Sequence, residues 1–265
     1  MLQIFLFIFS VISYDIKSLP LLFENDKIKA YKIHEHLWMF WIKSSTNSIF
    51  IIEGSEKSLV IDCGVKVSGL SSMISKVTSK PQVLALTHGH RDHSASISQF
   101  SKVYMNIKDK MMLLPYDGNI TYVDDGDIID IGDKQFQVIA MYGHTEGSIG
   151  FLDIQDKWLF TGDAIGSTSL WMQITPLPLE TALDVIWRID DIEDYFQEIF
   201  VGHYPELDHI ANMTYVNKMR YLIEKVLYTK DYPNEPFGGG FFSSAVVSKF
   251  EDVELVYNQD NLYYK

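Results

Sequence analysis

The chain has 265 residues, of which 47% are apolar and 14% aromatic, enough to bury one large core in a single globular domain. Lys and Arg number 22 against 35 Asp and Glu, which gives a net charge of −13. This balance argues against the clustered cations that a phosphate backbone requires, so we expect no nucleic-acid partner.

The first element in the chain is an apolar run over residues 2–12. It is too short to cross a bilayer and is typical of the core of a secretory signal, although no Lys or Arg precedes it. We predict a signal peptide over residues 1–13, followed by a single domain over residues 14–265 without a transmembrane span. The alternative is a buried first strand. A signal peptide places the protein outside the cell or in the lumen of the secretory pathway.

Three residues bear on this predicted compartment. The sequons at Asn119 and Asn212 are compatible with a glycoprotein of a eukaryotic lumen. Cys63 is the only cysteine, so no internal disulfide can form. The stability of the chain must therefore come from its core or from a metal.

The sequence pattern of the first half of the domain predicts a sheet followed by a helix. Residues 32–62 consist of β-branched and aromatic runs separated by polar turns, which predicts a hairpin-rich sheet. Residues 67–79 carry apolar side chains at helical spacing, and residues 81–87 form a buried strand. Further strand pairs are expected within 126–142 and 149–162.

The second half ends in helices and a last pair of strands. We expect helices in 179–196 and 217–229, a short strand at 198–201, and a final strand pair at 245–250 and 253–257. The Gly- and Pro-containing stretch 233–242 joins the last helix to that pair. No internal repeat is found, and no linker is long enough to separate two domains.

The stretch ALTHGHRDHSAS, residues 85–96, places His88, His90, Asp92 and His93 within six positions. Residues two apart in an extended chain point the same way, so the first two histidines can address one ion. Asp92 and His93 follow the end of the strand, where the chain turns toward a second point nearby. Imidazole nitrogen and carboxylate oxygen are ligands of zinc, and they also accept iron or manganese.

Three later stretches have a similar form, with a polar residue beside glycine just after a β-like run. They are MYGHTEGS with His144, WLFTGDAIG with Asp163, and IFVGHYPE with His203. Glycine next to a ligand lets the backbone turn sharply and lets a metal approach closely. We expect these residues to join the same metal centre.

The ordered set LVIDCG, THGHRDH, GHTEGS, FTGDA and GHY resembles the motifs of the metallo-β-lactamase-fold hydrolases over about residues 33–223. The resemblance implies an α/β fold, a four-layer αββα sandwich of two mixed sheets flanked by helices, with the site at one edge. It implies a first metal bound by His88, His90 and His144, a second bound by Asp92, His93 and His203, and Asp163 as the bridge between them. Asp62 matches a carboxylate that orients a metal ligand, with a strand-end turn as the alternative.

Two divalent ions, most simply zinc, would lower the pKa of a bridging water and supply hydroxide. Asp92 is the expected catalytic residue, which orients the hydroxide and passes its proton to the leaving group. Asp163 stands where the best-known zinc β-lactamases have cysteine, which favours the glyoxalase II, thioesterase and lactonase branch. No basic cluster for a glutathione-binding domain follows His203.

The predicted function is hydrolysis of a small-molecule ester, thioester or lactone. One alternative is a mononuclear iron dioxygenase of the persulfide dioxygenase type, which would use His88, His144 and Asp163. A phosphodiesterase and a metal-stabilised binding protein are further alternatives.

Two aromatic residues are candidates for contact with the substrate. Residues 164–180 follow the bridging aspartate and should pass over the pocket, where Trp171 could form an apolar wall for an acyl group. The alternative is that Trp171 packs between sheet and helix. Tyr204 could donate a hydrogen bond to a developing oxyanion, or it could belong to the core or rim.

Overall fold

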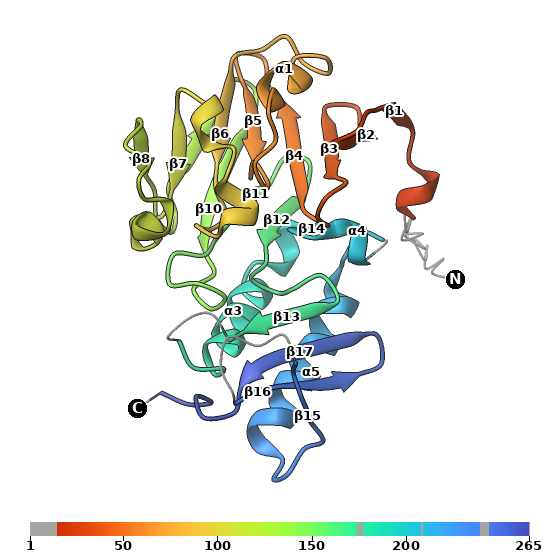
Figure 1. Cartoon of the computed structure of the whole chain (residues 1–265), viewed down its shortest axis with the longest axis vertical. Coiled ribbons are helices and arrows are strands. Elements are labelled where there is room, and N and C mark those ends of the chain that lie inside the picture. The colour runs from red at the N-terminus through yellow and green to blue at the C-terminus, as the bar shows by residue number, and fades with distance from the viewer. Residues whose placement is uncertain (1–14, 174–176, 208, 239–243, 265) are drawn as a thin grey trace, which may run out of the picture.

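Two β-sheets lie face to face in the computed structural model of the chain (Figure 1). The structure describes residues 15–173, 177–207, 209–238 and 244–264. Residues 1–13, with the predicted signal peptide, lie outside this part. No helix in the described ranges is both long enough and apolar enough to span a membrane.

The first sheet has eight strands in sequence order, and its topology changes half-way. The strands are β1 (Leu21–Glu24), β2 (Ile28–His34), β3 (Leu37–Ile42), β4 (Ser48–Glu53), β5 (Ser58–Ile61), β6 (Gln82–Ala85), β7 (Val103–Met105) and β8 (Ile120–Tyr122). Pairs from β1 to β5 are antiparallel hairpins, whereas β5 to β8 pair in parallel. Parallel neighbours need a crossover, and these crossovers carry the short helices and ligand loops of this half.

The second sheet has five strands in the order β14-β12-β11-β10-β9. They are β9 (Ile128–Asp130), β10 (Gln135–Ala140), β11 (Ile149–Asp153), β12 (Trp158–Gly162) and β14 (Glu198–Val201). Only β12 and β14 pair in parallel, with α3 (Thr181–Asp190) in the connection between them. Both sheets are therefore mixed, as predicted.

Aromatic side chains fill the space between the two sheets. Phe50 of the first sheet lies 5.3 Å from Phe160 and 5.4 Å from Phe200 of the second, measured between ring centroids. Burial of large aromatic rings dominates the energy of such a core. This shared core fixes the two sheets relative to each other and so positions the loops at their common edge.

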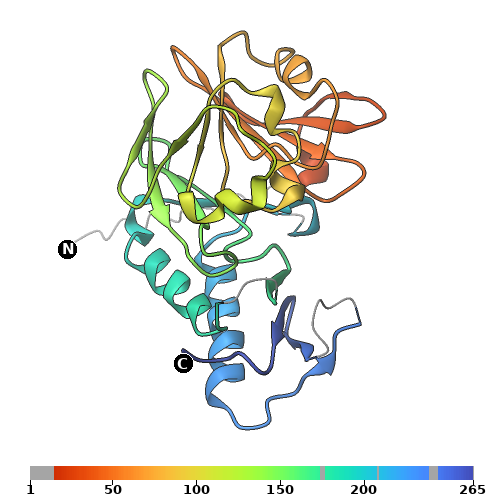
Figure 2. The same cartoon turned by 60° about the vertical axis from the view of Figure 1, so that its left-hand side comes forward.

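Helices form the two outer layers. On one side α1 (Leu70–Ile74) packs in the same buried cluster as the outer face of the first sheet. On the other side α3 and α5 (Met213–Tyr228) lie next to each other and bury their apolar residues in the cluster of the second sheet (Figure 2). The predicted αββα sandwich is confirmed.

The helix expected over 67–79 is shorter than the apolar spacing suggests. Only Leu70–Ile74 is α-helical, because Gly69 enters in the left-handed region at φ 75° and the chain after Ile74 continues in tight turns. The serines in this stretch have low helix propensity. The helix expected over 179–196 likewise ends at Asp190 and continues as a short 3-10 turn, η4 (Glu193–Tyr195).

A third sheet, which the sequence pattern does not reveal, closes the C-terminal end. It has the order β13-β17-β16-β15, with β13 (Ser169–Met172), β15 (Glu235–Pro236), β16 (Ala245–Phe250) and β17 (Val253–Asn258). The last two strands are the predicted final pair. Their partner β13 pairs in parallel with β17 and comes from the stretch expected to be a loop over the pocket.

Candidate metal centre

The seven predicted ligands lie where strands of both sheets end, at one edge of the sandwich. His88 and His90 follow β6, Asp92 and His93 belong to α2 (Arg91–Ser94), and His144, Asp163 and His203 follow β10, β12 and β14. Strand ends of two packed sheets meet at a common edge, so the fold brings together residues that are far apart in sequence.

The ligands form two groups whose ligand atoms lie within 4.8 Å of one another. One group contains the three histidines His88, His90 and His144. The other contains Asp92, His93, Asp163 and His203. The structure therefore groups all seven as the resemblance implies, with Asp163 counted in the second group.

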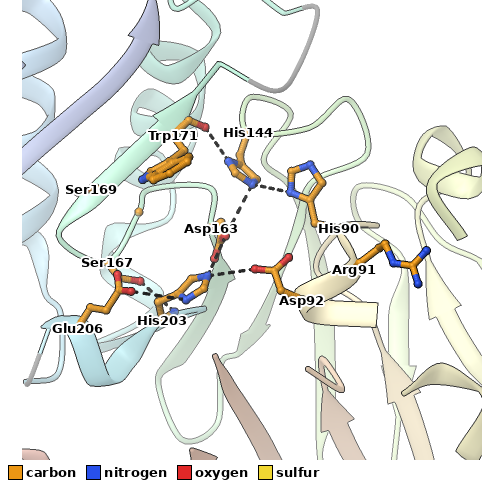
Figure 3. A pocket seen from close by; sticks show the side chains of 11 residues that line it. His90, Arg91, Asp92, His144, Asp163, Ser167, Ser169, Trp171, His203 and Glu206 are labelled. Carbon is orange, nitrogen blue, oxygen red and sulfur yellow. Dashed lines mark hydrogen bonds and ion pairs between the residues drawn. The ribbon is translucent and has the colours of Figure 1, made fainter. Parts of the chain in front are cut away.

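Asp163 lies between the two groups (Figure 3). Its Oδ2 atom is 3.7 Å from Nε2 of His144 and 4.0 Å from Nε2 of His88 in the first group. The same oxygen is 3.3 Å from Nε2 of His93 and 3.4 Å from Nε2 of His203 in the second. A single carboxylate oxygen thus faces ring nitrogens of both groups.

Asp62 orients one histidine of each group. Its Oδ2 accepts a hydrogen bond from Nδ1 of His93 at 2.8 Å and another from the hydroxyl of Thr87 at 2.8 Å. The Thr87 hydroxyl has given its only hydrogen to Asp62, so it accepts from Nδ1 of His88 at 3.0 Å. In both histidines Nδ1 is therefore the nitrogen that donates to a partner, and Nε2 is the ligand atom that faces Asp163.

His144 is oriented by the main chain. Its Nδ1 donates to the carbonyl oxygen of Trp171 at 2.8 Å, which leaves Nε2 bare and 3.0 Å from Nδ1 of His90. Nε2 of His88 and Oδ1 of Asp163 are buried and have no hydrogen-bond partner among the described residues. Bare nitrogens and carboxylate oxygens that converge in this way fit divalent metal ions.

Burial sets the protonation of the two groups differently. Burial lowers the pKa of His88 well below its ordinary value, and burial beside His144 lowers the pKa of His90 to about 4. Burial also acts against the charged form of His93, but the carboxylates of Asp163 and Asp62 outweigh it and raise that pKa. Neutral imidazole is the form that binds metal. The histidines of the first group, whose pKa values are lowered by burial, are therefore neutral at physiological pH.

The ligand groups open into a cavity of about 570 Å³. Its lining combines ligands with polar and aromatic side chains, namely His90, Arg91, Asp92, His144, Asp163, Gly166, Ser167, Ser169, Trp171, His203 and Glu206. Trp171 and Arg91 lie on opposite sides of the centre (Figure 3). The ring of Phe237 packs edge-on against Trp171 at 5.1 Å. The cavity thus has an aromatic side, and Arg91 lies at the opposite side with its guanidinium directed away from the centre (Figure 3).

Comparison with known families fits this geometry. The model of the metallo-β-lactamase superfamily matches residues 42–190. The chain belongs to this superfamily. Its relatives and its histidine and aspartate groups identify it as a metal-dependent hydrolase.

Relatives of the chain in the superfamily include several hydrolases. Acyl-coenzyme A thioesterase MBLAC2 of Gallus gallus is 25% identical over 217 residues, covering 63% of this chain and 77% of that protein. The probable polyketide biosynthesis zinc-dependent hydrolase PksB of Bacillus subtilis is 29% identical over 184 residues, covering 66% and 79%. A hydroxyacylglutathione hydrolase of Francisella tularensis is 29% identical over 131 residues, covering 48% of this chain and 50% of that enzyme.

Solved structures of the superfamily share the fold. The metallo-β-lactamase FIM-1 of Pseudomonas aeruginosa, in its mono-zinc form, superposes with a TM-score of 0.60 at 18% identity. The alignment covers 76% of this chain and 96% of that structure. This likeness concerns the fold alone.

The position of Tyr204 contradicts one prediction about the site. Its side chain is buried, with 0% exposed, and its ring lies 6.5 Å from that of Phe50 in the core. The helix α4 (Tyr204–Leu207) begins immediately after His203 and turns the Tyr204 side chain inward. The predicted contact of Tyr204 with an oxyanion is therefore wrong.

Asp109 connects two ligand loops of the site but does not belong to any motif of the sequence. It is buried in the 3-10 segment η3 (Ile107–Leu113). Its carboxylate accepts the N–H of Gly89 at 2.8 Å, the hydroxyl of Thr145 at 2.7 Å and the N–H of Gly147 at 2.9 Å. It thereby ties the loop of His88 and His90 to the loop of His144. Only a three-dimensional structure could reveal this contact, because the surrounding residues lack a ligand pattern.

Proposed function

We propose that the chain is a dinuclear, zinc-dependent hydrolase of carboxylic esters, thioesters or lactones, with acyl thioesters as its preferred substrates. The observation that carries this proposal is the position of Asp163, whose Oδ2 faces nitrogens of both ligand groups at 3.3 to 4.0 Å. A carboxylate in that position suits a bridge between two cations.

The bound metal ions and the side chain of Asp92 would have separate roles in hydrolysis. A pair of bound metal ions would supply hydroxide near neutral pH and polarise the carbonyl oxygen. Asp92 offers the base, because its carboxylate side chain is 42% exposed and lines the cavity. Nδ2 of the fully buried Asn47 donates to Oδ2 of Asp92 at 3.2 Å and so holds that carboxylate in place.

The cavity supports an acyl substrate. Trp171, against which Phe237 packs, supplies apolar surface on one side, and Arg91 offers a cation for an acidic leaving group on the other. The relative MBLAC2 is an acyl-coenzyme A thioesterase, and another relative is a hydroxyacylglutathione hydrolase. We infer that the acyl group lies toward Trp171 and the carrier thiol toward Arg91.

The test combines metal analysis with a substrate screen. Protein purified without chelator is assayed for zinc, iron and manganese, and then for hydrolysis of acyl thioesters, p-nitrophenyl esters, lactones and bis(p-nitrophenyl) phosphate. Two ions per chain and fastest turnover of thioesters are the expected results. One ion per chain, or preference for the phosphodiester, would refute the proposal.

The iron dioxygenase alternative makes less use of the observed residues. It needs His88, His144 and Asp163, but it gives no metal role to His93 and His203. The structure brings those two histidines together with Asp163, with Nε2 atoms 3.3 and 3.4 Å from its Oδ2. Iron content with persulfide-dependent oxygen uptake would favour the dioxygenase.

Trp171→Ala should change the preference for acyl chain length. We expect kcat/KM for a long-chain thioester to fall about 10-fold, since lost contact with two methylenes is worth about 1.6 kcal/mol. Hydrolysis of the acetyl thioester should change little, because the carbonyl of residue 171 still accepts from Nδ1 of His144. Trp187→Ala is the matched control, as Trp187 is 51% exposed on α3. An equal loss for both chain lengths would contradict an acyl-binding role.

We further propose that the protein enters the secretory pathway. The support is the apolar run over residues 2–12, together with the exposed side chain of Asn119 in one of the two sequons. Asn212 accepts the N–H of Thr214 at the start of α5, which makes it the less accessible acceptor. Sequencing of the mature N-terminus after expression in a secretory host should find Tyr14 first. An intact Met1 would refute cleavage.

A further inference from the structure

The turn between β3 and β4 is joined to the loop that carries His203. The N–H of Ser48 donates to the carbonyl of Gly202 at 2.8 Å. In return, the N–H of Tyr204 donates to the hydroxyl of Ser48 at 3.2 Å. These two bonds flank His203 on both sides, so the turn of the first sheet and the ligand of the second sheet form one unit.

Thr46 in this turn contacts His203 directly. Its Oγ1 lies 2.9 Å from Nδ1 of His203, and its hydroxyl donates to a carboxylate oxygen of Glu206. A threonine hydroxyl has one hydrogen, and a carboxylate can only accept. Thr46 must therefore accept from His203, which carries its hydrogen on Nδ1. The bare Nε2 then lies 3.4 Å from Oδ2 of Asp163 and 3.6 Å from Oδ2 of Asp92.

We propose that Thr46 and Glu206 form a hydrogen-bond relay that fixes His203 as an Nε2 ligand and sets the affinity of the second metal position. The inference rests on the proposed dinuclear function. A carboxylate behind a ligating histidine fixes its tautomer and strengthens it as a ligand. Here the carboxylate acts through a threonine hydroxyl, as Asp62 acts on His88 through Thr87.

Asp62 supports a histidine of both groups, whereas the relay of Thr46 and Glu206 acts on His203 of the second group alone. Asp62 is buried at 2% exposure, whereas the side chain of Glu206 is 39% exposed and lines the cavity. Solvent screens the exposed carboxylate more strongly than the buried one. The contribution of Glu206 to the second position should accordingly respond to what occupies the cavity beside it.

Thr46→Val and Glu206→Gln test the relay by zinc affinity. Stepwise zinc binding is measured by competition with a chromophoric chelator on metal-free protein. We expect the second zinc to bind 10- to 100-fold more weakly in Thr46→Val, the usual cost of removing such a partner, and the first zinc to be unchanged. The loss should be smaller in Glu206→Gln, whose amide oxygen still accepts from Thr46 but carries no charge. Thr46→Ser keeps the hydroxyl and should restore wild-type affinity. Thr229→Val, at the exposed C-terminal end of α5, is the matched control.

Cobalt substitution gives a second readout that a merely structural role would not change. The visible absorption of the second Co²⁺ should shift in Thr46→Val and return in Thr46→Ser. Glu206→Gln replaces an exposed side chain, so it remains informative even if Thr46→Val does not fold. Unchanged second-zinc affinity in Glu206→Gln would overturn the relay. Wild-type protein that binds only one zinc would instead overturn the dinuclear proposal, so the two failures are distinguishable.

Discussion

Asp163→Asn is expected to lower kcat/KM by about 1,000-fold or more for every substrate that the wild-type protein hydrolyses. An asparagine side chain is nearly the same size, but it presents a neutral amide where one carboxylate oxygen faces both ligand groups. Loss of metal-derived charge stabilisation costs several kcal/mol in the transition state. Each 1.36 kcal/mol corresponds to a factor of ten in rate.

The charges around Asp163 indicate what else changes in this variant. Burial acts to raise the pKa of Asp163, but His93 and His203 outweigh it and hold the pKa well below its ordinary value. The carboxylate is therefore ionised in the folded protein. Its removal takes away the charged oxygen that faces both ligand groups, so we expect zinc content to fall from two ions to one or none.

Steady-state kinetics and zinc analysis on the same preparation check this prediction. Asp153→Asn is the control, because Asp153 is a buried aspartate at the end of β11 in the same sheet but lies outside both ligand groups. Its Oδ1 accepts the N–H groups of Gln155 and Asp156, a role that an amide oxygen can also fill. An Asp163→Asn protein that keeps two zinc ions and a tenth of the wild-type activity would contradict the bridging role.

The seven ligands could be identified because each shows a local sequence pattern, and their division into two groups was implied by the family resemblance. His144, Asp163 and His203 each lie beside a glycine shortly after an apolar run, which is the pattern of a strand that ends in a tight turn. Gly202 illustrates the constraint, since a Cβ there would lie 2.1 Å from Oδ1 of Asp163. Such steric requirements act over one or two residues and therefore appear in the sequence.

The residues behind the ligands were not predictable, because their roles depend on contacts between distant segments. Thr46 and Asn47 read as an ordinary polar turn, yet they contact His203 and Asp92, which lie in other loops. The parallel pairing of β13 with β17 depends on a long-range register that no local pattern encodes. Tyr204 was misassigned for the same reason, since the direction of its side chain is set by the start of α4.

Asp92→Asn is expected to slow hydrolysis by about 100- to 10,000-fold, and by more for alkyl esters than for thioesters. Burial raises the pKa of Asp92, but the neighbouring His93 outweighs this and lowers the pKa below its ordinary value. Asp92 is thus a carboxylate at neutral pH and can take a proton from the nucleophile. An amide in its place can neither accept that proton nor deliver it to the leaving group.

The identity of the leaving group separates proton delivery from metal binding. A thiol with a pKa of about 8.5 leaves readily as its anion, whereas an alkoxide is far more basic and requires a proton as it departs. We compare the ethyl ester and the N-acetylcysteamine thioester of hexanoic acid at saturating zinc, with Glu146→Gln, an exposed carboxylate in the His144 loop, as the control. A larger loss for the ester identifies Asp92 as the residue that delivers the proton. An equal loss for both substrates would restrict Asp92 to holding the second metal, because metal loss weakens attack on the carbonyl whichever group leaves.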